Sequence, residues 1–471
     1  MPVLAVNVTE EDDIVKTIAF AKSKNLRLVI KSTGHDILKR STGYGSLSIW
    51  LYNFRNGVEY HDSYSTVNTC ATTNWTGSAF TIKGAYAWSD VYPLADEKGL
   101  ILVGGNNKGP CSTGGWTQGG GHSGVGRYFG MGADQVLSAR VVLASGEIVT
   151  ASPCSHPDLF TALRGGGPGT YGVVTEMTFK AFPTQNVTVT YIEVGSPTHN
   201  TSTFLDVMEQ FYSSYPYLSD IGFAGYGTWS IGAPAALFGN HTTAYTHSLT
   251  LLGSTEAQAE AKFAPVLDKI VGFNGSEIFI NITHKEFPDW GTYFNQKADT
   301  IAPVGNVGVS ASRLIDGAAL TGNRTLLRES LEVMAGAPEE QTYHSVGLHG
   351  GEIFAHADDP YSSLLPAWRK SYILDIVARR WTGDKAHDDE VAHDIRQVKV
   401  PAMQRLAPDT GSYMNEADYG NVDWKVDFYG ANYERLSKIK ERYDPDDTFY
   451  CLTCVGSEKW EEDADGSLCK V

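Results

Sequence analysis

The sequence lacks long hydrophobic runs and has no excess of basic residues. No stretch of 18 or more apolar residues occurs in its 471 residues, so it predicts no membrane-spanning helix. The formal net charge is −17, from 37 lysines and arginines against 54 aspartates and glutamates. Nucleic acids and anionic membranes attract basic surfaces, so we expect neither as a partner. The chain is also too long for a single hydrophobic core, which predicts two domains.

Cysteine is scarce, and its spacing does not complete a metal site. Cys451 and Cys454 have the spacing of half a zinc ribbon, but no second CxxC or HxxxH pair follows, so no metal is predicted. We expect instead a disulfide from Cys469 to Cys451 or to Cys454, and the sequence does not select between them. The other three cysteines are Cys70, Cys111 and Cys154.

The chain shows no N-terminal secretion signal but carries many acceptor motifs for N-glycosylation. Residues 1–3 lead directly into a strand-like segment, so we expect a mature or N-terminally trimmed form. Eight Asn-x-Ser/Thr motifs exceed the number expected by chance and predict a secreted, extracellular protein with N-linked glycans. We expect it to be a monomer. The motifs begin at Asn7, Asn74, Asn186, Asn200, Asn240, Asn274, Asn281 and Asn323.

Composition and periodicity divide the chain into three parts, residues 1–184, 185–412 and 413–471. The first shows β-α-β alternation, the second alternates strands with longer amphipathic helices, and the third contains one further helix. The predicted elements are a helix over 9–25 capped by Thr9, strands over 26–30 and 47–51, a hairpin over 136–150, a strand over 173–179, and helices over 255–271 and 428–442.

Three glycine-rich segments lie in the first part of the chain. They read KSTGHDILKRSTG (31–43), GGWTQGGGHSGVGRYFGMGADQVL (114–137) and LRGGGPGTYGVVT (163–175). Neither of the last two is a strand-to-helix turn with an acidic residue about 20 positions on, which excludes a Rossmann dinucleotide site. Glycines serve tight turns as well, but three such segments, one carrying His35, indicate loops around one long phosphate-bearing ligand such as FAD.

Two further motifs, YMNEAD (413–418) and FYGANYERLSKIKERYDPDDTFY (428–450), follow near the C-terminus, and together these motifs carry a resemblance that extends over almost the whole chain. The chain resembles the vanillyl-alcohol-oxidase / p-cresol-methylhydroxylase flavoproteins. Within them it is similar to the berberine-bridge-enzyme-like branch and to fungal isoamyl-alcohol-oxidase-like proteins. The resemblance implies an α+β, two-domain FAD-binding fold of the PCMH type. Residues 1–184 would bind FAD, an antiparallel-sheet substrate domain over 185–412 would cover the flavin, and 413–471 would return to the FAD domain.

The resemblance also implies a covalent bond from His35 to the flavin 8α-methyl group; the alternative is a loop histidine that hydrogen-bonds a phosphate. Many relatives form a second bond through a cysteine, and an ungapped count places Lys108 at that position and Cys111 three residues later. Cys111 could therefore bond the flavin, join a disulfide or remain a buried thiol. The cofactor-binding residues implied are Ser32, Thr33, Gly34, His35, Asp36, Ser41, Cys111, Gly119, Gly120, Gly121, His122, Ser123, Gly169, Thr170, Val174 and Asn415.

Oxidation of a hydroxyl group requires a base for the O–H proton. The candidates are Tyr413, His344, His349 and Glu352, and Lys108 or Arg369 could lower the pKa of a tyrosine.

Two of these candidates, His344 and His349, lie five residues apart in one strand-like run. An odd spacing places them on opposite faces, unless Gly347 marks a bulge. His344 shares its face with Val346 and Leu348, which favours a core histidine, whereas His349 suits a polar cleft better. This arrangement also argues against a shared metal.

The resemblance and the glycosylation motifs together predict a secreted FAD-linked oxidase that acts on an alcohol or sugar hydroxyl and passes electrons to oxygen, giving hydrogen peroxide. Two alternatives stay open. One is a flavin dehydrogenase with another electron acceptor, and the other is a glycosylated carbohydrate-binding protein with a vestigial flavin site.

Overall fold

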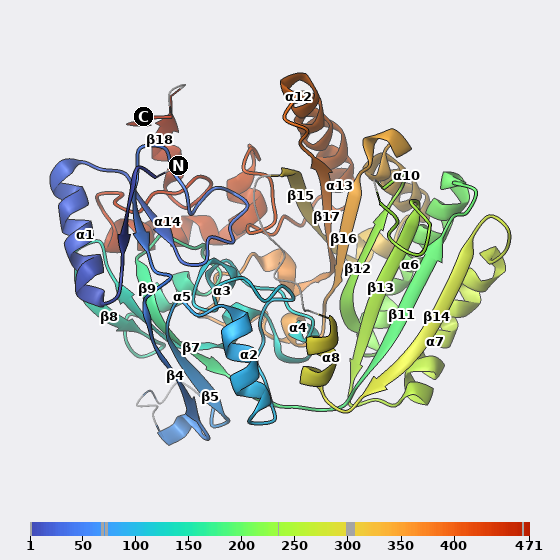
Figure 1. The fold of residues 1–471 in the computed structure, drawn as a ribbon, viewed down its shortest axis with the longest axis horizontal. Helices are drawn as coiled ribbons and strands as arrows, with labels where there is room; N and C mark the ends of the chain where they lie inside the picture. The colour runs from blue at the N-terminus through green and yellow to red at the C-terminus, as the bar shows by residue number, and fades with distance from the viewer. Residues whose placement is uncertain (1, 67–69, 71–73, 234, 298–306, 464–465) are drawn as a thin grey trace.

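Two antiparallel sheets organise the chain, one in each half of the molecule (Figure 1). The computed structural model describes residues 2–66, 70, 74–233, 235–297, 307–463 and 466–471. A five-stranded sheet in the order β4-β5-β9-β7-β8 lies in the N-terminal half. A seven-stranded sheet in the order β14-β11-β13-β12-β16-β17-β15 forms most of the second half. The predicted α+β, two-domain fold is therefore confirmed.

The N-terminal half opens with a parallel β-α-β unit. Helix α1 connects the edge strand β1 to β2, and both strands pair in parallel with β3. Residue Asp13 accepts hydrogen bonds from the backbone N–H groups of Thr9 and Glu10, so the N-cap is Glu10 and not the predicted Thr9. The bounds are β1 (Leu4–Asn7), α1 (Glu11–Lys24), β2 (Leu28–Lys31) and β3 (Leu47–Trp50).

Beyond β3 the predicted β-α-β alternation is wrong, because the next strands of this half pair antiparallel. The hairpin predicted over 136–150 is confirmed as β7 and β8. The elements here are β4 (Arg55–His61), β5 (Ala79–Gly84), α2 (Trp88–Asp96), β6 (Leu100–Ile101), α3 (Gly115–Gln118), α4 (Gly126–Phe129), β7 (Val136–Val142), β8 (Ile148–Ala151), α5 (Pro157–Leu163), β9 (Val173–Lys180) and β10 (Phe182–Pro183).

The seven-stranded sheet has one apolar face and one polar face. Helices α6, α7 and α10 cover the apolar face, where Trp229, Tyr245 and Val346 belong to one buried cluster. Alternation places the intervening residues on the face toward the N-terminal half. The elements are β11 (Val187–Gly195), α6 (Thr201–Asp220), β12 (Ala224–Ser230), β13 (Ala244–Leu252), α7 (Glu256–Ile270), β14 (Phe279–Phe287), α8 (Trp290–Lys297), β15 (Gly308–Asp316), α9 (Gly317–Thr321), α10 (Arg324–Ala335), β16 (Tyr343–Leu348), α11 (Glu352–Ala355), β17 (Ser371–Arg380), α12 (Lys385–Asp394) and α13 (Val400–Leu406).

The C-terminal segment returns to the N-terminal half, where both chain ends lie (Figure 1). Helix α14 (Tyr433–Tyr443) starts later than predicted, because the chain turns at Gly430 with a φ of +54°. The buried Lys440 donates to the carbonyls of Thr170 and Phe449 and pairs with Asp444. A short hairpin of β18 (Trp460–Glu462) and β19 (Leu468–Lys470) follows.

The disulfides differ from the prediction. Cys451 bonds Cys454, three residues away, and Cys70 bonds Cys154. Cys469 is therefore not bonded to either predicted partner, and its thiol lies 3.1 Å from a carboxylate oxygen of Asp463. Within the described ranges, no helix is long and apolar enough to cross a bilayer.

Candidate active site

A cavity of about 590 Å³ lies between the two halves of the molecule. One wall comes from the three glycine-rich segments and from residues 413–416, and the other from strands β12, β13, β16 and β17. Of the predicted residues, it is lined by Ser32, Thr33, Gly34, His35, Asp36, Ser41, Cys111, His122, Gly169, Val174, Tyr413 and Asn415. The structure therefore brings together side chains that are almost 400 positions apart.

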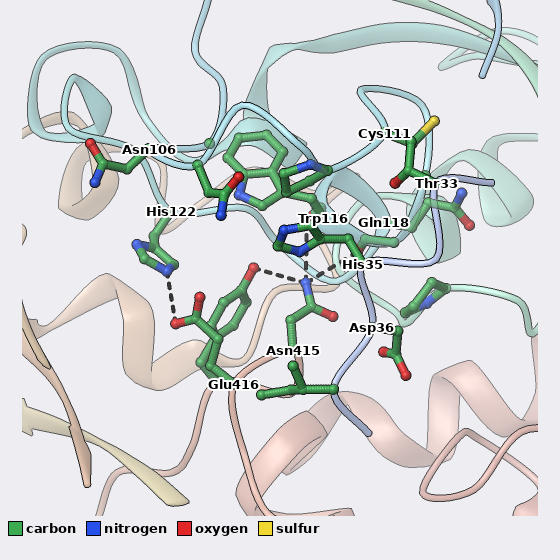
Figure 2. Close-up of a pocket in the computed structure, with 18 of the residues that line it drawn as sticks. Thr33, His35, Asp36, Asn106, Cys111, Trp116, Gln118, His122, Asn415 and Glu416 are labelled. Atoms are coloured by element: carbon green, nitrogen blue, oxygen red, sulfur yellow. Dashed lines mark hydrogen bonds and ion pairs between the residues drawn. The ribbon is translucent and has the colours of Figure 1, made fainter. Parts of the chain in front are cut away.

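The first glycine-rich loop is held in place from within and from the C-terminal segment. Asp36 accepts hydrogen bonds from the backbone N–H of Arg40, at 2.6 Å, and from its guanidinium Nε, at 2.7 Å. The same guanidinium donates to Oδ1 of Asn415 at 2.9 Å. Gly34 has a φ of +78°, a conformation that glycine adopts without strain. These contacts hold the loop in place, and its residues 32–37, 40 and 41 line the cavity, where Figure 2 labels Thr33, His35 and Asp36.

His35 lies at the centre of this wall (Figure 2). Its Nε2 is buried and has no hydrogen-bond partner among the described residues. Burial lowers the pKa of His35 below 6.5, although the nearby Glu416 and Asp36 carboxylates and the Asn107 side chain oppose this shift. The imidazole is therefore neutral at neutral pH, and its unshared nitrogen lone pair is available to a ligand.

The triple glycine of the second segment, Gly119 to Gly121, lies behind residues that line the cavity. A Cβ atom on Gly119 would lie 2.4 Å from Oδ1 of Asn415, and one on Gly121 would lie 2.8 Å from the Trp116 ring. These glycines instead let Asn415 and Trp116, which both line the cavity, approach the backbone. Gly120 likewise lets the Leu364 side chain approach the backbone, since a Cβ atom on Gly120 would lie 2.8 Å from Cδ2 of Leu364.

Two further cofactor candidates lie behind the cavity wall. Ser123 is buried, and its hydroxyl accepts from the backbone N–H of Val125 at 3.4 Å. The Thr170 hydroxyl donates to the Pro168 carbonyl at 3.1 Å, while the adjacent Gly169 lines the cavity.

Cys111 is a buried thiol at the edge of the cavity. Its sulfur lies 3.5 Å from the Thr113 hydroxyl and points away from His35 (Figure 2). Burial raises the pKa of the thiol, so it stays protonated at neutral pH. Lys108 occupies the position at which the ungapped count places the flavin-bonding cysteine of relatives. Its Nζ donates a hydrogen bond to Oδ1 of Asn295 at 3.1 Å.

Of the four catalytic candidates, Tyr413 alone lines the cavity. His344 lies on the apolar face of the sheet, where it contacts Asp375 and the Met334 carbonyl, each at 3.3 Å, and stacks on Trp229. The structure thus makes it a core histidine, as its strand face predicts.

His349 and Glu352 also lie outside the cavity lining. His349 is fully buried beside His122, with their ring centroids 5.6 Å apart. The register of β16 has no shift at Gly347, so no bulge resets the alternation. Glu352 is exposed at the start of α11. Arg369 pairs with Asp134 and therefore holds a carboxylate rather than a tyrosine.

Sequence reasoning missed several groups in the cavity. Glu416 lies inside the YMNEAD motif, which by itself assigns it no role. Tyr226, on strand β12, carries no local signal, since its importance depends on which strand faces the loops. Other polar lining residues that were not predicted include Arg40, Asn106, Asn107, Trp116, Gln118, Thr228, Thr246, His247, Ser248 and Ser345.

The residues present fit FAD. The cavity combines a glycine-containing loop, whose backbone N–H groups suit a pyrophosphate, with a buried nitrogen of a neutral histidine that has no hydrogen-bond partner among the described residues. Ser32, Thr33, Gly34 and Ser41 would hold the phosphates, and His35, Trp116 and Asn415 would surround the ring system.

Comparison with known proteins agrees with this site. Residues 2–152 match the family model described as FAD binding domain, and residues 412–453 match the one described as Berberine and berberine like. The chain is 49% identical to FAD-linked oxidoreductase apf9 of Gibberella fujikuroi, covering 100% of this chain and 81% of that protein. It is 31% identical to VAO-type flavoprotein oxidase VAO615 of Thermothelomyces thermophilus, covering 100% and 79%.

Among solved structures, the crystal structure of the VAO-type flavoprotein MtVAO713 from Myceliophthora thermophila C1 superposes with a TM-score of 0.95. It is 41% identical, and the match covers 99% of this chain and 82% of that one. Fold and site therefore define a two-domain flavoprotein. The chain belongs to the VAO/PCMH family of FAD-linked oxidoreductases that carry a berberine-like C-terminal segment.

Proposed function

We propose that this protein is an FAD-linked oxidase that oxidises the hydroxyl group of an alcohol or sugar. The observation that carries the proposal is the cavity in which the cofactor loop around His35 faces a sheet surface of hydroxyl side chains. When bound, FAD supplies the hydride acceptor and then passes both electrons to oxygen, giving hydrogen peroxide. The name of the relative VAO615, a flavoprotein oxidase, supports oxygen as the acceptor.

His35 is proposed to form a covalent bond from a ring nitrogen to the 8α-methyl carbon of the flavin. Its nitrogen Nε2 is buried without a hydrogen-bond partner in the described part of the chain, and burial lowers the pKa, which favours a neutral, nucleophilic imidazole. Cys111 is not proposed as a second anchor, because its protonated thiol points away from His35.

The sheet wall supports a neutral, hydroxyl-bearing substrate. Thr228 and Thr246 are cross-strand neighbours with their hydroxyl oxygens 3.2 Å apart, and Ser345 is the neighbour of Thr228 on the other side. Among the lining residues described for this sheet, none is a lysine, arginine, aspartate or glutamate. A charged substrate would therefore find no ion-pair partner on this wall.

A screen for reduction of the bound flavin tests the proposal. We expect at least one of benzyl alcohol, vanillyl alcohol, glucose and cellobiose to bleach the flavin absorbance in anaerobic stopped-flow. Rapid reoxidation by air with formation of hydrogen peroxide would support an oxidase. Slow reoxidation would point to a dehydrogenase, and a flavin that no compound in the panel reduces would contradict the proposed activity.

We also propose that the protein is secreted and glycosylated, and that it acts as a monomer. None of the eight acceptor asparagines is buried, so glycans could attach without unfolding the chain. Treatment with an endoglycosidase is expected to lower the apparent mass of protein secreted by a fungal host. An unchanged mass would contradict glycosylation.

A further inference from the structure

Three side chains from distant parts of the chain form a continuous hydrogen-bonded series at the cavity. The Tyr226 hydroxyl, on β12, lies 2.7 Å from Nδ1 of His122. Nitrogen Nε2 of the same imidazole lies 3.0 Å from a carboxylate oxygen of Glu416, and Figure 2 shows this second contact. All three residues line the cavity.

The chemistry of these groups fixes the direction of both hydrogen bonds. A carboxylate can only accept, so His122 must carry its proton on Nε2 and donate to Glu416. In the neutral imidazole, Nδ1 is then an acceptor, and the Tyr226 hydroxyl donates to it. The arrangement has the order hydroxyl, imidazole, carboxylate, in which the carboxylate holds the ring tautomer and stabilises an imidazolium that forms.

Among the described residues around Tyr226, His122 is the one placed to accept its proton. Its ring packs edge-on against Tyr413 and His349, at centroid distances of 5.1 and 5.6 Å. The titratable groups that face it are these two together with Tyr226 and Glu416. Burial, assisted by the positive charge that His122 can carry, lowers the pKa of His349 well below 6.5, so His349 stays neutral.

We propose that Tyr226 is the group that accepts the hydroxyl proton of the substrate, with His122 and Glu416 as the relay that makes this possible. The inference rests on the proposed alcohol oxidation. The substrate O–H bond breaks and a new O–H bond forms on Tyr226, while the Tyr226 proton moves to Nδ1 of His122. Loss of this proton from oxygen, together with loss of a hydride from the carbon that bears this oxygen, gives the carbonyl product.

The relay explains how a tyrosine with a high pKa can act as a base. Burial, and secondly the negative charge of Glu416, raise the pKa of Tyr226 well above 10, so its oxygen carries a proton at neutral pH. The Tyr226 oxygen can accept the substrate proton only if it releases its own proton. Nδ1 of His122 is placed to receive that released proton. Glu416, with 34% of its side chain exposed, then connects the imidazolium to solvent.

Tyr413 lacks such an acceptor. Its hydroxyl oxygen accepts from the backbone N–H of Gly121 at 3.3 Å and from Nδ2 of Asn415 at 2.8 Å. Both neighbours are N–H donors, and in the described part of the chain no imidazole or carboxylate is hydrogen-bonded to this hydroxyl. Tyr413 can therefore donate a hydrogen bond into the cavity but cannot pass its proton on.

The test compares Tyr226→Phe with the wild-type holoenzyme, using the compound of the panel above that bleaches the flavin fastest. FAD content and reduction by dithionite are measured first, to show an intact cofactor site. We expect Tyr226→Phe to lower the rate constant of anaerobic flavin reduction about 10²- to 10⁴-fold at neutral pH. The residual rate should rise about tenfold per pH unit, because the variant can use only substrate that is already ionised.

Three further variants make the result specific. Glu416→Gln should lower the rate about 10²-fold and show the same rise with pH, and it replaces Tyr226→Phe if that variant fails to load FAD. Tyr413→Phe should keep the wild-type pH profile. The matched control Tyr217→Phe, in which the lost hydroxyl contacts the Lys262 carbonyl on the outer helices, should leave the rate unchanged.

A rate for Tyr226→Phe within about fivefold of wild type, or a lower rate with the wild-type pH profile, would overturn the relay. So would a tenfold rise per pH unit in Tyr413→Phe, because Tyr413 would then be the acceptor. If no compound reduces the wild-type flavin although dithionite does, the proposed function itself fails, and the relay fails with it.

Discussion

The His35→Ala variant is expected to release its flavin into the supernatant on acid precipitation, whereas the wild-type protein keeps the flavin in the pellet. Only the proposed covalent bond would distinguish the two proteins, because unfolding in acid abolishes every non-covalent contact of the cavity. His35 suits this bond since its Nε2 is buried, has no hydrogen-bond partner among the residues that the structure describes, and belongs to a neutral imidazole. The measurement is flavin fluorescence of the washed pellet, with mass analysis of the peptide containing residue 35.

The matched variant is Cys111→Ala, which removes the cysteine thiol that lines the cavity. It should keep all of its flavin in the pellet, because the Cys111 sulfur points away from His35 and its pKa is raised by burial. Flavin that stays in the pellet of His35→Ala until Cys111 is also replaced would show that both residues bond the cofactor. Release of flavin from the wild-type pellet would disprove the covalent link but not FAD binding.

The cofactor side of the site could be predicted because its signals are local. The 13-residue segment 31–43 is sufficient to predict a cofactor loop, because it places a histidine in a glycine-containing loop between two strands. His35, Gly34 and Ser41 of this segment all line the cavity. The glycines of 119–121 illustrate the limit of such reasoning. The sequence indicates that another group approaches the backbone closely at these glycines, but it does not identify that group. In the structure the neighbours are Asn415 and Trp116.

The proton relay could not be predicted, because it depends on how three distant segments meet. Tyr226 lies 104 positions from His122, and Glu416 lies 294 positions from it. Nothing in the alternation of β12 shows which face looks toward the cofactor loops until the sheet order is known. By contrast, His344 was recognisable as a core residue, since its strand face carries Val346 and Leu348 and this periodicity is local.

The Arg369→Met variant is expected to lose about 3–5 kcal/mol of unfolding free energy, because it leaves a buried carboxylate without its counter-charge. Arg369 makes two parallel hydrogen bonds of 2.8 Å to Asp134, whose side chain is 1% exposed. The pair joins the segment that carries His122 to the turn before β17. Chemical denaturation at neutral pH measures the loss, and Lys385→Met, which removes an exposed ion pair, should show no measurable change.

The acid dependence of stability identifies Asp134 as the responsible group. Burial raises its pKa, but the hydrogen bonds and charge of Arg369 outweigh burial and lower the pKa below its ordinary value of 3.8. Asp134 therefore contributes its full stabilisation above pH 3.8 and loses it as the pH falls through the lower value of the folded state. This part of the acid destabilisation should disappear in Asp134→Asn.

A double variant tests whether Asp134 and Arg369 act as a pair. The variant that combines Asp134→Asn with Arg369→Met should lose less unfolding free energy than the two single variants lose together, by about 0.5–3 kcal/mol, because no buried charge is then left unpaired. Strict additivity of the two losses would show that the residues do not act as a pair.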